Sequence, residues 1–166
     1  MSAFLAFGAV SGAGMKLHSE ADVKAAFIYN FTKFVQWPSC PEACPILLIG
    51  YCGGTKMMEA LKRLEGRKCQ QMLIKVKKIT DFHDLAELKV MVIENSSDIS
   101  EEMLRGVSER NILTISQGPD AVEKGVVIGL FKENNRIRFA INLRKAKENG
   151  LKISSRLLKL AKYVIR

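Results

Sequence analysis

Residues 46–64 read ILLIGYCGGTKMMEALKRL, which is an unbroken apolar run, a glycine turn and an amphipathic segment in direct succession. The run 46–51 is typical of a parallel strand that is buried on both faces. Residues 56–64 then predict a helix, because apolar side chains recur there at helical spacing, at Met57, Met58, Leu61 and Leu64.

The same alternation continues along the chain. It predicts strands at 72–76, 90–94 and 112–115, and helices at 82–88 and 99–107. An earlier helix is predicted over residues 19–37, since Ser19 is a suitable N-cap and Pro38 a stop signal.

The C-terminal third predicts a hairpin followed by two helices. Apolar runs at 126–131 and 137–141 are joined by polar residues that include Asn134 and Asn135, as in an antiparallel pair. A helix at 142–148, with Asn142 as a cap, precedes a break at Gly150, and a last helix follows Ser154. The expected fold is a single-domain α/β three-layer sandwich. It has a mostly parallel sheet of about six strands, a C-terminal antiparallel hairpin and about five helices.

The first 18 residues stand apart from this pattern. The apolar run from Phe4 to Val10 and the small residues from Ser11 to Gly14 resemble parts of a secretory signal. No Lys or Arg precedes Lys16, so a cloning scar or a frayed tail explains the run equally well. We therefore interpret 1–18 as a signal-peptide remnant or disordered leader, and 19–166 as the domain.

Charge and composition narrow the class of partner. The formal net charge is +9, yet the basic residues are spread along the chain and form no block of about five or more like charges. A nucleic-acid-binding protein gathers its cations on one face with aromatic side chains for stacking, and most aromatics here lie in apolar patterns. We expect no nucleic-acid partner.

Two segments near the ends of the domain carry a family resemblance. The first is VKAAFIYNFTKFVQWP at residues 23–38, and the second is RFAINL at 138–143, which continues through GLKISS at 150–155 and LLKLA at 157–161. Together they resemble the opening and closing motifs of the YfiR-like family. The resemblance extends over about residues 22–164, and the middle agrees in the order of elements more than in residues.

This resemblance implies a non-enzymatic periplasmic α/β protein, often dimeric, that binds an inner-membrane diguanylate cyclase and represses it. Release of the cyclase raises cyclic di-GMP and favours biofilm growth. The chain departs from the family pattern where Leu88 and Lys89 replace a common Cys-His pair, and where Ala140 replaces a common Glu. The first departure removes one expected disulfide partner, and the second puts in doubt any interface that needs the carboxylate.

Four cysteines are present, Cys40, Cys44, Cys52 and Cys69. Parallel strands begin at the same edge of a sheet, so Cys44 and Cys69, each just before a predicted strand, form the expected disulfide if those strands are neighbours. Cys40 is the reserve partner. Cys52 lies about 20 Å away at the far end of its strand, beyond the roughly 4.4–6.8 Å between Cα atoms that a disulfide tolerates.

Two further candidate sites follow from the pattern. The turn formed by Gly50, Gly53, Gly54 and Thr55 could hold a small ligand at a helix N-terminus, although a tight strand-to-helix turn explains the glycines better. In the last predicted helix, Arg156, Lys159 and Lys162 fall opposite the apolar face. They form a candidate interaction surface toward an acidic partner or anionic lipid.

No catalytic, cofactor or metal site is predicted. No acid–base pair or phosphate motif is visible, and the cysteines lack zinc-ligand spacing. A periplasmic small-molecule sensor on the same fold is the alternative to the repressor, and a nucleotide-dependent enzyme ranks last.

Overall fold

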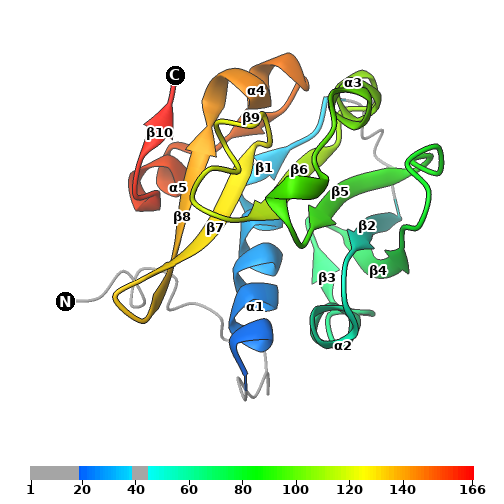
Figure 1. Ribbon diagram of the computed structural model, residues 1–166. Coiled ribbons are helices and arrows are strands. Elements are labelled where there is room, and N and C mark those ends of the chain that lie inside the picture. Colours follow the sequence, from blue (N-terminus) through cyan, green and yellow to red (C-terminus); the bar gives the residue numbers. More distant parts are fainter. Residues whose placement is uncertain (1–18, 39–44) are drawn as a thin grey trace.

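The computed structural model of the protein describes residues 19–38 and 45–166 (Figure 1). Its helices are α1 (Glu20–Lys33), α2 (Thr55–Lys62), the short 3-10 helix η1 (Ser96–Asp98), α3 (Glu101–Glu109), α4 (Leu143–Glu148) and α5 (Ser155–Leu160). Its strands are β1 (Val35–Gln36), β2 (Ile46–Cys52), β3 (Lys68–Cys69), β4 (Met72–Lys78), β5 (Leu88–Ile93), β6 (Leu113–Gln117), β7 (Ile128–Glu133), β8 (Arg136–Asn142), β9 (Lys152–Ile153) and β10 (Val164–Ile165).

Eight of these strands form one sheet in the order β10-β8-β7-β6-β5-β2-β4-β3. The central pairs from β4 through β7 are parallel, whereas β7 with β8 and β3 with β4 are antiparallel. The α/β class, the mostly parallel sheet and the C-terminal hairpin are therefore confirmed. The strands β1 and β9 form a separate two-stranded sheet.

Alternating side chains on the central strands divide the core into two layers. In β5, Val90 and Val92 belong to the larger cluster with α1, α2, α4 and α5, while Met91 and Ile93 pack with α3 on the other face. Because both faces are covered, the strand carries an unbroken apolar run, as a buried parallel strand does. Within the described ranges, no helix is long and apolar enough to cross a membrane.

Capping and turn residues predicted from the sequence have the expected geometry. Ser19, Asn142 and Ser154 are the N-caps of α1, α4 and α5, and each side chain accepts a hydrogen bond from a backbone N–H of its helix. Asn134 and Asn135 both have positive φ, at 48° and 60°. Two such residues are what a two-residue hairpin turn needs.

The first predicted helix is too long. α1 ends at Lys33, and the chain then continues into β1, which pairs with β9 through Val35 opposite Ile153. The helical pattern continues to Trp37 because Phe34 and Trp37 do face the core. The hydrogen bonds that end the helix come from distant segments, which periodicity does not detect.

The helix predicted at 82–88 is absent and its residues form turns. The Asp81 side chain accepts the His83 N–H at 2.9 Å, and Glu87 has a φ of 67°. A side chain that captures a backbone N–H competes with helix formation, and a positive φ cannot continue a helix. The strand that follows begins at Leu88, two residues earlier than predicted.

The last predicted helix is also shorter than expected. α5 ends at Leu160, and Val164 and Ile165 then pair in parallel with Ile141 and Asn142 of β8. The apolar residues 164 and 165 therefore belong to a sheet edge instead of a helix face.

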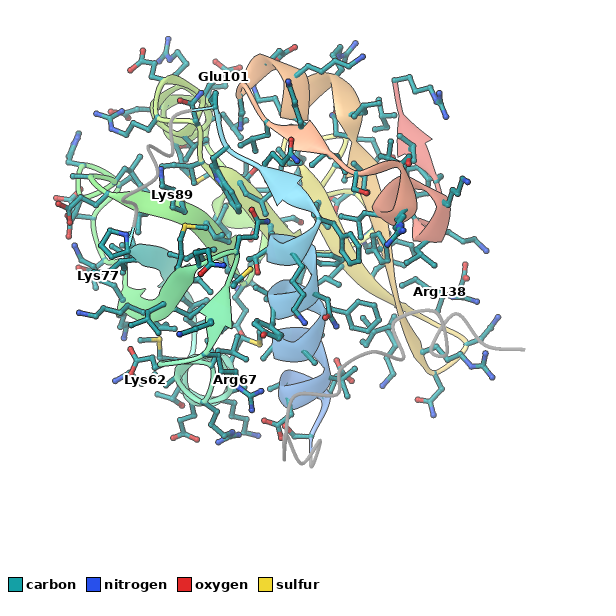
Figure 2. All side chains as sticks on the ribbon, turned by 180° about the vertical axis from the view of Figure 1, so that it is seen from behind. Lys62, Arg67, Lys77, Lys89, Glu101 and Arg138 are labelled. Carbon is teal, nitrogen blue, oxygen red and sulfur yellow. The ribbon has the colours of Figure 1, made fainter. Side chains whose placement is uncertain are left out.

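A surface ion-pair cluster joins the start of α1 to β7. Glu20 contacts Lys24 at 2.9 Å and Lys132 at 3.0 Å. The hydrogen bond from Lys24, followed by that from Lys132, lowers the pKa of Glu20 to about 2. In Figure 2, Lys62, Lys77 and Lys89 lie along one side of the molecule and Arg138 lies on the other.

Candidate functional site

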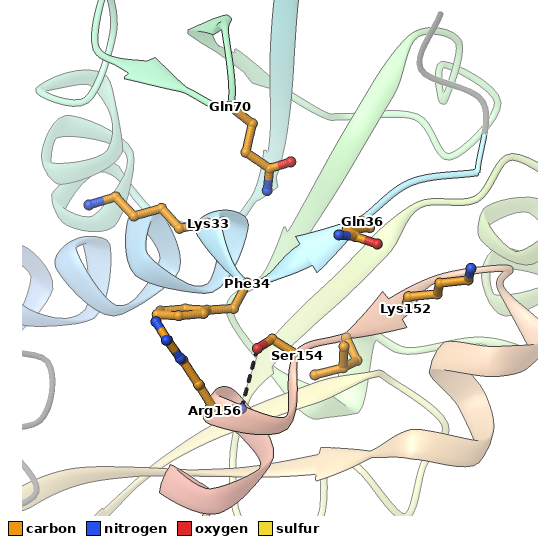
Figure 3. Close-up of a pocket in the computed structure, with 8 residues that line it drawn as sticks. Lys33, Phe34, Gln36, Gln70, Lys152, Ser154 and Arg156 are labelled. Atoms are coloured by element: carbon orange, nitrogen blue, oxygen red, sulfur yellow. Dashed lines mark hydrogen bonds between the residues drawn. The ribbon is translucent and has the colours of Figure 1, made fainter.

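A polar cavity of about 440 Å³ opens at the C-terminal end of α1 (Figure 3). Its lining comes from five separate elements or turns, and the residues are Lys33, Phe34, Gln36, Gln70, Lys152, Ile153, Ser154 and Arg156. The cavity therefore exists only in the folded chain.

The pairing of β1 with β9 brings the two ends of the domain together at this cavity. Gln36 lies opposite Lys152 in that pair, and the Ser154 N–H donates to the Phe34 carbonyl at 2.9 Å. Phe31 of α1 packs against Phe139 of β8 with ring centroids 4.9 Å apart. The two motifs that carry the family resemblance thus form one continuous structural unit.

Gln70 attaches the β3–β4 turn to the same place. Its Nε2 donates to the Thr32 carbonyl at 2.7 Å and to the Val35 carbonyl at 2.9 Å. The last carbonyls of a helix have no partner within the helix, so this amide satisfies one of them and holds the cavity wall in position.

The lining is strongly basic. Lys33, Lys152 and Arg156 contribute cations, and no carboxylate is present among the described residues that line the cavity. The Arg156 side chain extends toward the Phe34 ring (Figure 3). The Lys33 ammonium lies over the Tyr29 ring, 4.2 Å from its centroid, so Arg156 is the cation beside Phe34. A guanidinium next to an aromatic ring suits a small anionic ligand with a flat apolar part.

Nucleophilic chemistry has little support in this cavity. Ser154 accepts the Arg156 N–H at 3.3 Å as the cap of α5. The described lining includes no histidine or carboxylate that could act as its base. The geometry favours binding over catalysis.

The three residues of the predicted interaction surface do not share one helix face. Arg156 lines the cavity and Lys159 is exposed on α5. Lys162 lies beyond the end of α5 and pairs with Glu133 of β7 at 3.1 Å. Arg156 and Lys159 remain a candidate surface, whereas Lys162 forms an ion pair with the β7–β8 hairpin.

The glycine turn is occupied by a side chain of the protein itself. The Gly54 N–H at the start of α2 donates to Glu94 Oε2 at 2.5 Å, and Thr55 is the first residue of the helix. An anionic ligand would have to displace this carboxylate. Burial, and next the nearby Glu94 carboxylate, raise the pKa of Tyr51 above its usual range.

Gly50, which the sequence assigned to the turn, lies inside strand β2 and has a packing role. A Cβ at this position would lie 2.8 Å from side-chain atoms of both Ile79 and Leu88. Any larger residue would force the Ile79 and Leu88 side chains to move, so packing explains this glycine without a ligand.

The predicted disulfide lies partly outside the described residues. β2 and β4 are parallel neighbours, as the prediction requires. Cys69 is a free buried thiol, 3.2 Å from Thr32 Oγ1, and burial raises its pKa. Cys40 and Cys44 are not among the described residues, so the pairing stays a prediction.

Sequence reasoning missed part of the cavity. Lys33, Gln36 and Lys152 lie within the two end motifs, and those motifs were the available signal for them. Gln70 belongs to neither motif, and nothing in its local sequence marks it. Its position depends on the β3–β4 turn reaching α1.

Comparison with known proteins gives one family and a shared fold. The family model described as YfiR/HmsC-like matches residues 21–162. No curated protein gives a significant match.

Solved structures that share the fold include the following two. The ABC domain from Streptococcus pneumonia in complex with L-Trp has a TM-score of 0.53 at 10% identity over 87% of this chain. A conserved domain protein from Vibrio cholerae O1 biovar El Tor has a TM-score of 0.59 at 13% identity over 88% of this chain. The chain covers 60% of each of those structures.

Proposed function

The chain belongs to the YfiR/HmsC-like family, and from that premise we propose that it is a periplasmic signalling protein that binds and represses an inner-membrane diguanylate cyclase. The observation that carries the proposal is the family match over residues 21–162. That range includes both end motifs, which pack together as one unit through β1 and β9. The protein would control cyclic di-GMP and, through it, biofilm formation, either alone or as a homodimer.

Repression of this kind works by population shift. The protein must bind the inactive cyclase more tightly than the active one, since only a difference in affinity moves the equilibrium. Arg156 and Lys159 form the first surface to test, because both are exposed basic residues of α5.

The test is genetic. Deleting the gene should raise cyclic di-GMP and surface attachment, and deleting the partner cyclase as well should abolish the rise. Lys159→Glu should release the cyclase if the surface is used, while the protein keeps its melting temperature. Unchanged cyclic di-GMP in the deletion strain, with a neighbouring cyclase normally expressed, contradicts repression.

The proposal includes that the protein is not an enzyme. Purified protein should not turn over GTP or cyclic di-GMP. Turnover that disappears on changing Gly53 or Lys56 would contradict this and restore the glycine turn as a nucleotide site.

A second candidate function is favoured by the basic cavity. A periplasmic sensor of a small anionic molecule would hold the anion at Arg156, in a lining that also includes Lys33 and Lys152. Binding to the native state alone raises the melting temperature by mass action. Phosphate, pyrophosphate and benzoate are suitable probes, and Arg156→Gln should abolish a shift that Lys159→Gln, the matched control outside the lining, preserves. An equal loss of the melting-temperature shift in both variants would show that the anion does not bind in the cavity.

A further inference from the structure

A second concave surface shares no lining residue with the basic cavity. It is a groove of about 720 Å³ at the N-terminal ends of β2 and β5. Its apolar floor is formed by Ile46, Leu48 and Leu88. None of these residues takes part in the cavity described above.

Strand register places the floor residues in one row. Leu48 of β2 pairs with Lys75 of β4 on one side and with Leu88 of β5 on the other. Ile46 pairs with Leu73 of β4, and the two side chains are 38% and 41% exposed. Residues at equivalent positions of paired strands point to the same face, so this end of the sheet presents a continuous apolar strip.

Helix packing covers only part of this strip, since Leu88 is buried in the cluster with α3 and Leu48 packs against that cluster. On the same face, α3 buries Met103 and Val107 against Met91 and Ile93 of β5. Ile46 and Leu73 are among the few large apolar side chains that stay exposed in the described part of the chain. The neighbouring side chains Ile46 and Leu73 are therefore the part of the strip that is open to a partner.

The rim of the groove is basic. Lys75, Lys89 and Arg110 contribute three cations, against the single carboxylate of Glu87 among the described lining residues. Arg110 is held by the Gly106 carbonyl at 2.9 Å and by Glu109 at 3.7 Å. Neither Lys75 nor Lys89 forms an ion pair with a described residue, so both are available to a partner.

The charge and shape of the groove indicate which kind of partner can bind there. A second copy of this chain using the same face would bring like-charged rims together, in a protein whose formal net charge is +9. A flat lipid surface would meet the lysines and the exposed Ile46 but would not fill the groove over the half-buried Leu48. A protein segment can meet both features.

We propose that this groove binds a segment of a partner protein that presents an apolar side chain flanked by carboxylates. The apolar side chain covers Leu48 and Ile46, and the carboxylates pair with Lys75 and Lys89. The proposal goes beyond cyclase repression and does not require that the partner be a cyclase.

The test uses the full chain and a fluorescein-labelled peptide of alternating aspartate and leucine, followed by fluorescence anisotropy. The double variant Lys75→Glu with Lys89→Glu should weaken binding at least about tenfold. The matched control, Lys62→Glu with Lys147→Glu, has the same net charge on exposed sites elsewhere and should change binding less than about twofold. Ile46→Asn should also weaken binding while the melting temperature shows that the fold persists.

Several outcomes would overturn the proposal. They are no detectable binding of the acidic peptide, equal loss in the groove and control variants, or equal binding of a peptide with lysine in place of aspartate. Phosphatidylglycerol vesicles that bind through Lys75 and Lys89 more strongly than the peptide does would assign the groove to lipid instead. None of these results depends on the cyclic di-GMP phenotype, so the two proposals fail separately.

Discussion

Replacing Gln70 by alanine should destabilise the protein through the loss of two hydrogen bonds that connect the β3–β4 turn to the end of α1. The Gln70 amide donates to the Thr32 and Val35 carbonyls at 2.7 and 2.9 Å. At about 0.5–1.5 kcal/mol for each net hydrogen bond, Gln70→Ala should lower the free energy of unfolding by about 1–3 kcal/mol. In a chain of this size that corresponds to a fall in melting temperature of about 2–12 °C.

The neighbouring residue supplies the control. Gln71 also has a positive φ, 72° against 48° for Gln70, and its side chain forms no hydrogen bond with a described residue. The backbone effect of Gln→Ala is therefore shared, and the difference between the two variants isolates the amide's hydrogen bonds. Urea titration followed by the fluorescence of Trp37, the single tryptophan, measures both. Equal destabilisation by Gln70→Ala and Gln71→Ala would refute the reasoning.

Three further predictions concern the core, the surface charges and the cysteines. Phe31→Ala should lower the free energy of unfolding by about 3–5 kcal/mol, because the ring is fully buried. Leu158→Ala, at a half-buried site, should lower it by less than about 2 kcal/mol. Similar losses in urea titrations of the two variants would contradict the difference in burial. The lowered pKa of Glu20 contributes stability that is complete above the ordinary value of 4.5 and is lost as the pH falls through about 2. Glu20→Gln should therefore reduce the change in melting temperature between those two pH values. The same pH dependence in the variant and the original protein would show that the ion pairs are not formed in solution. If oxidised protein contains a disulfide, peptide mapping should find Cys44 joined to Cys69; both recovered as free thiols beside another pair would contradict the predicted pairing.

The sequence contained most of the information about fold class because the relevant signals are local. The run at 46–51 and the glycine turn predict β2 and the start of α2, and Asn134 and Asn135 predict the hairpin turn between β7 and β8. Periodicity, caps and turn residues act over a few positions, so they can be recognised without knowing what lies across the sheet.

Predictions failed where distant residues compete with the local pattern. The helix pattern at 19–37 gives no sign that residues 35 and 36 pair with β9, about 117 positions away. The pattern at 82–88 is overridden by the Asp81 side chain and the positive φ of Glu87. Val164 and Ile165 were predicted to lie on a helix face, because the local pattern does not show that they pair with β8.

The candidate sites divide in the same way. By itself the sequence determined the two end motifs, and with them the family, because each motif is a contiguous segment; six residues of the basic cavity lie within these motifs. Only the tertiary structure decided that the motifs meet, that Gln70 joins them, that Glu94 fills the glycine turn and that Lys162 is engaged by Glu133. Each of these is a contact between segments that are far apart in the chain. Such segments become neighbours only when the strands take their order in the sheet, and the local sequence does not specify that order.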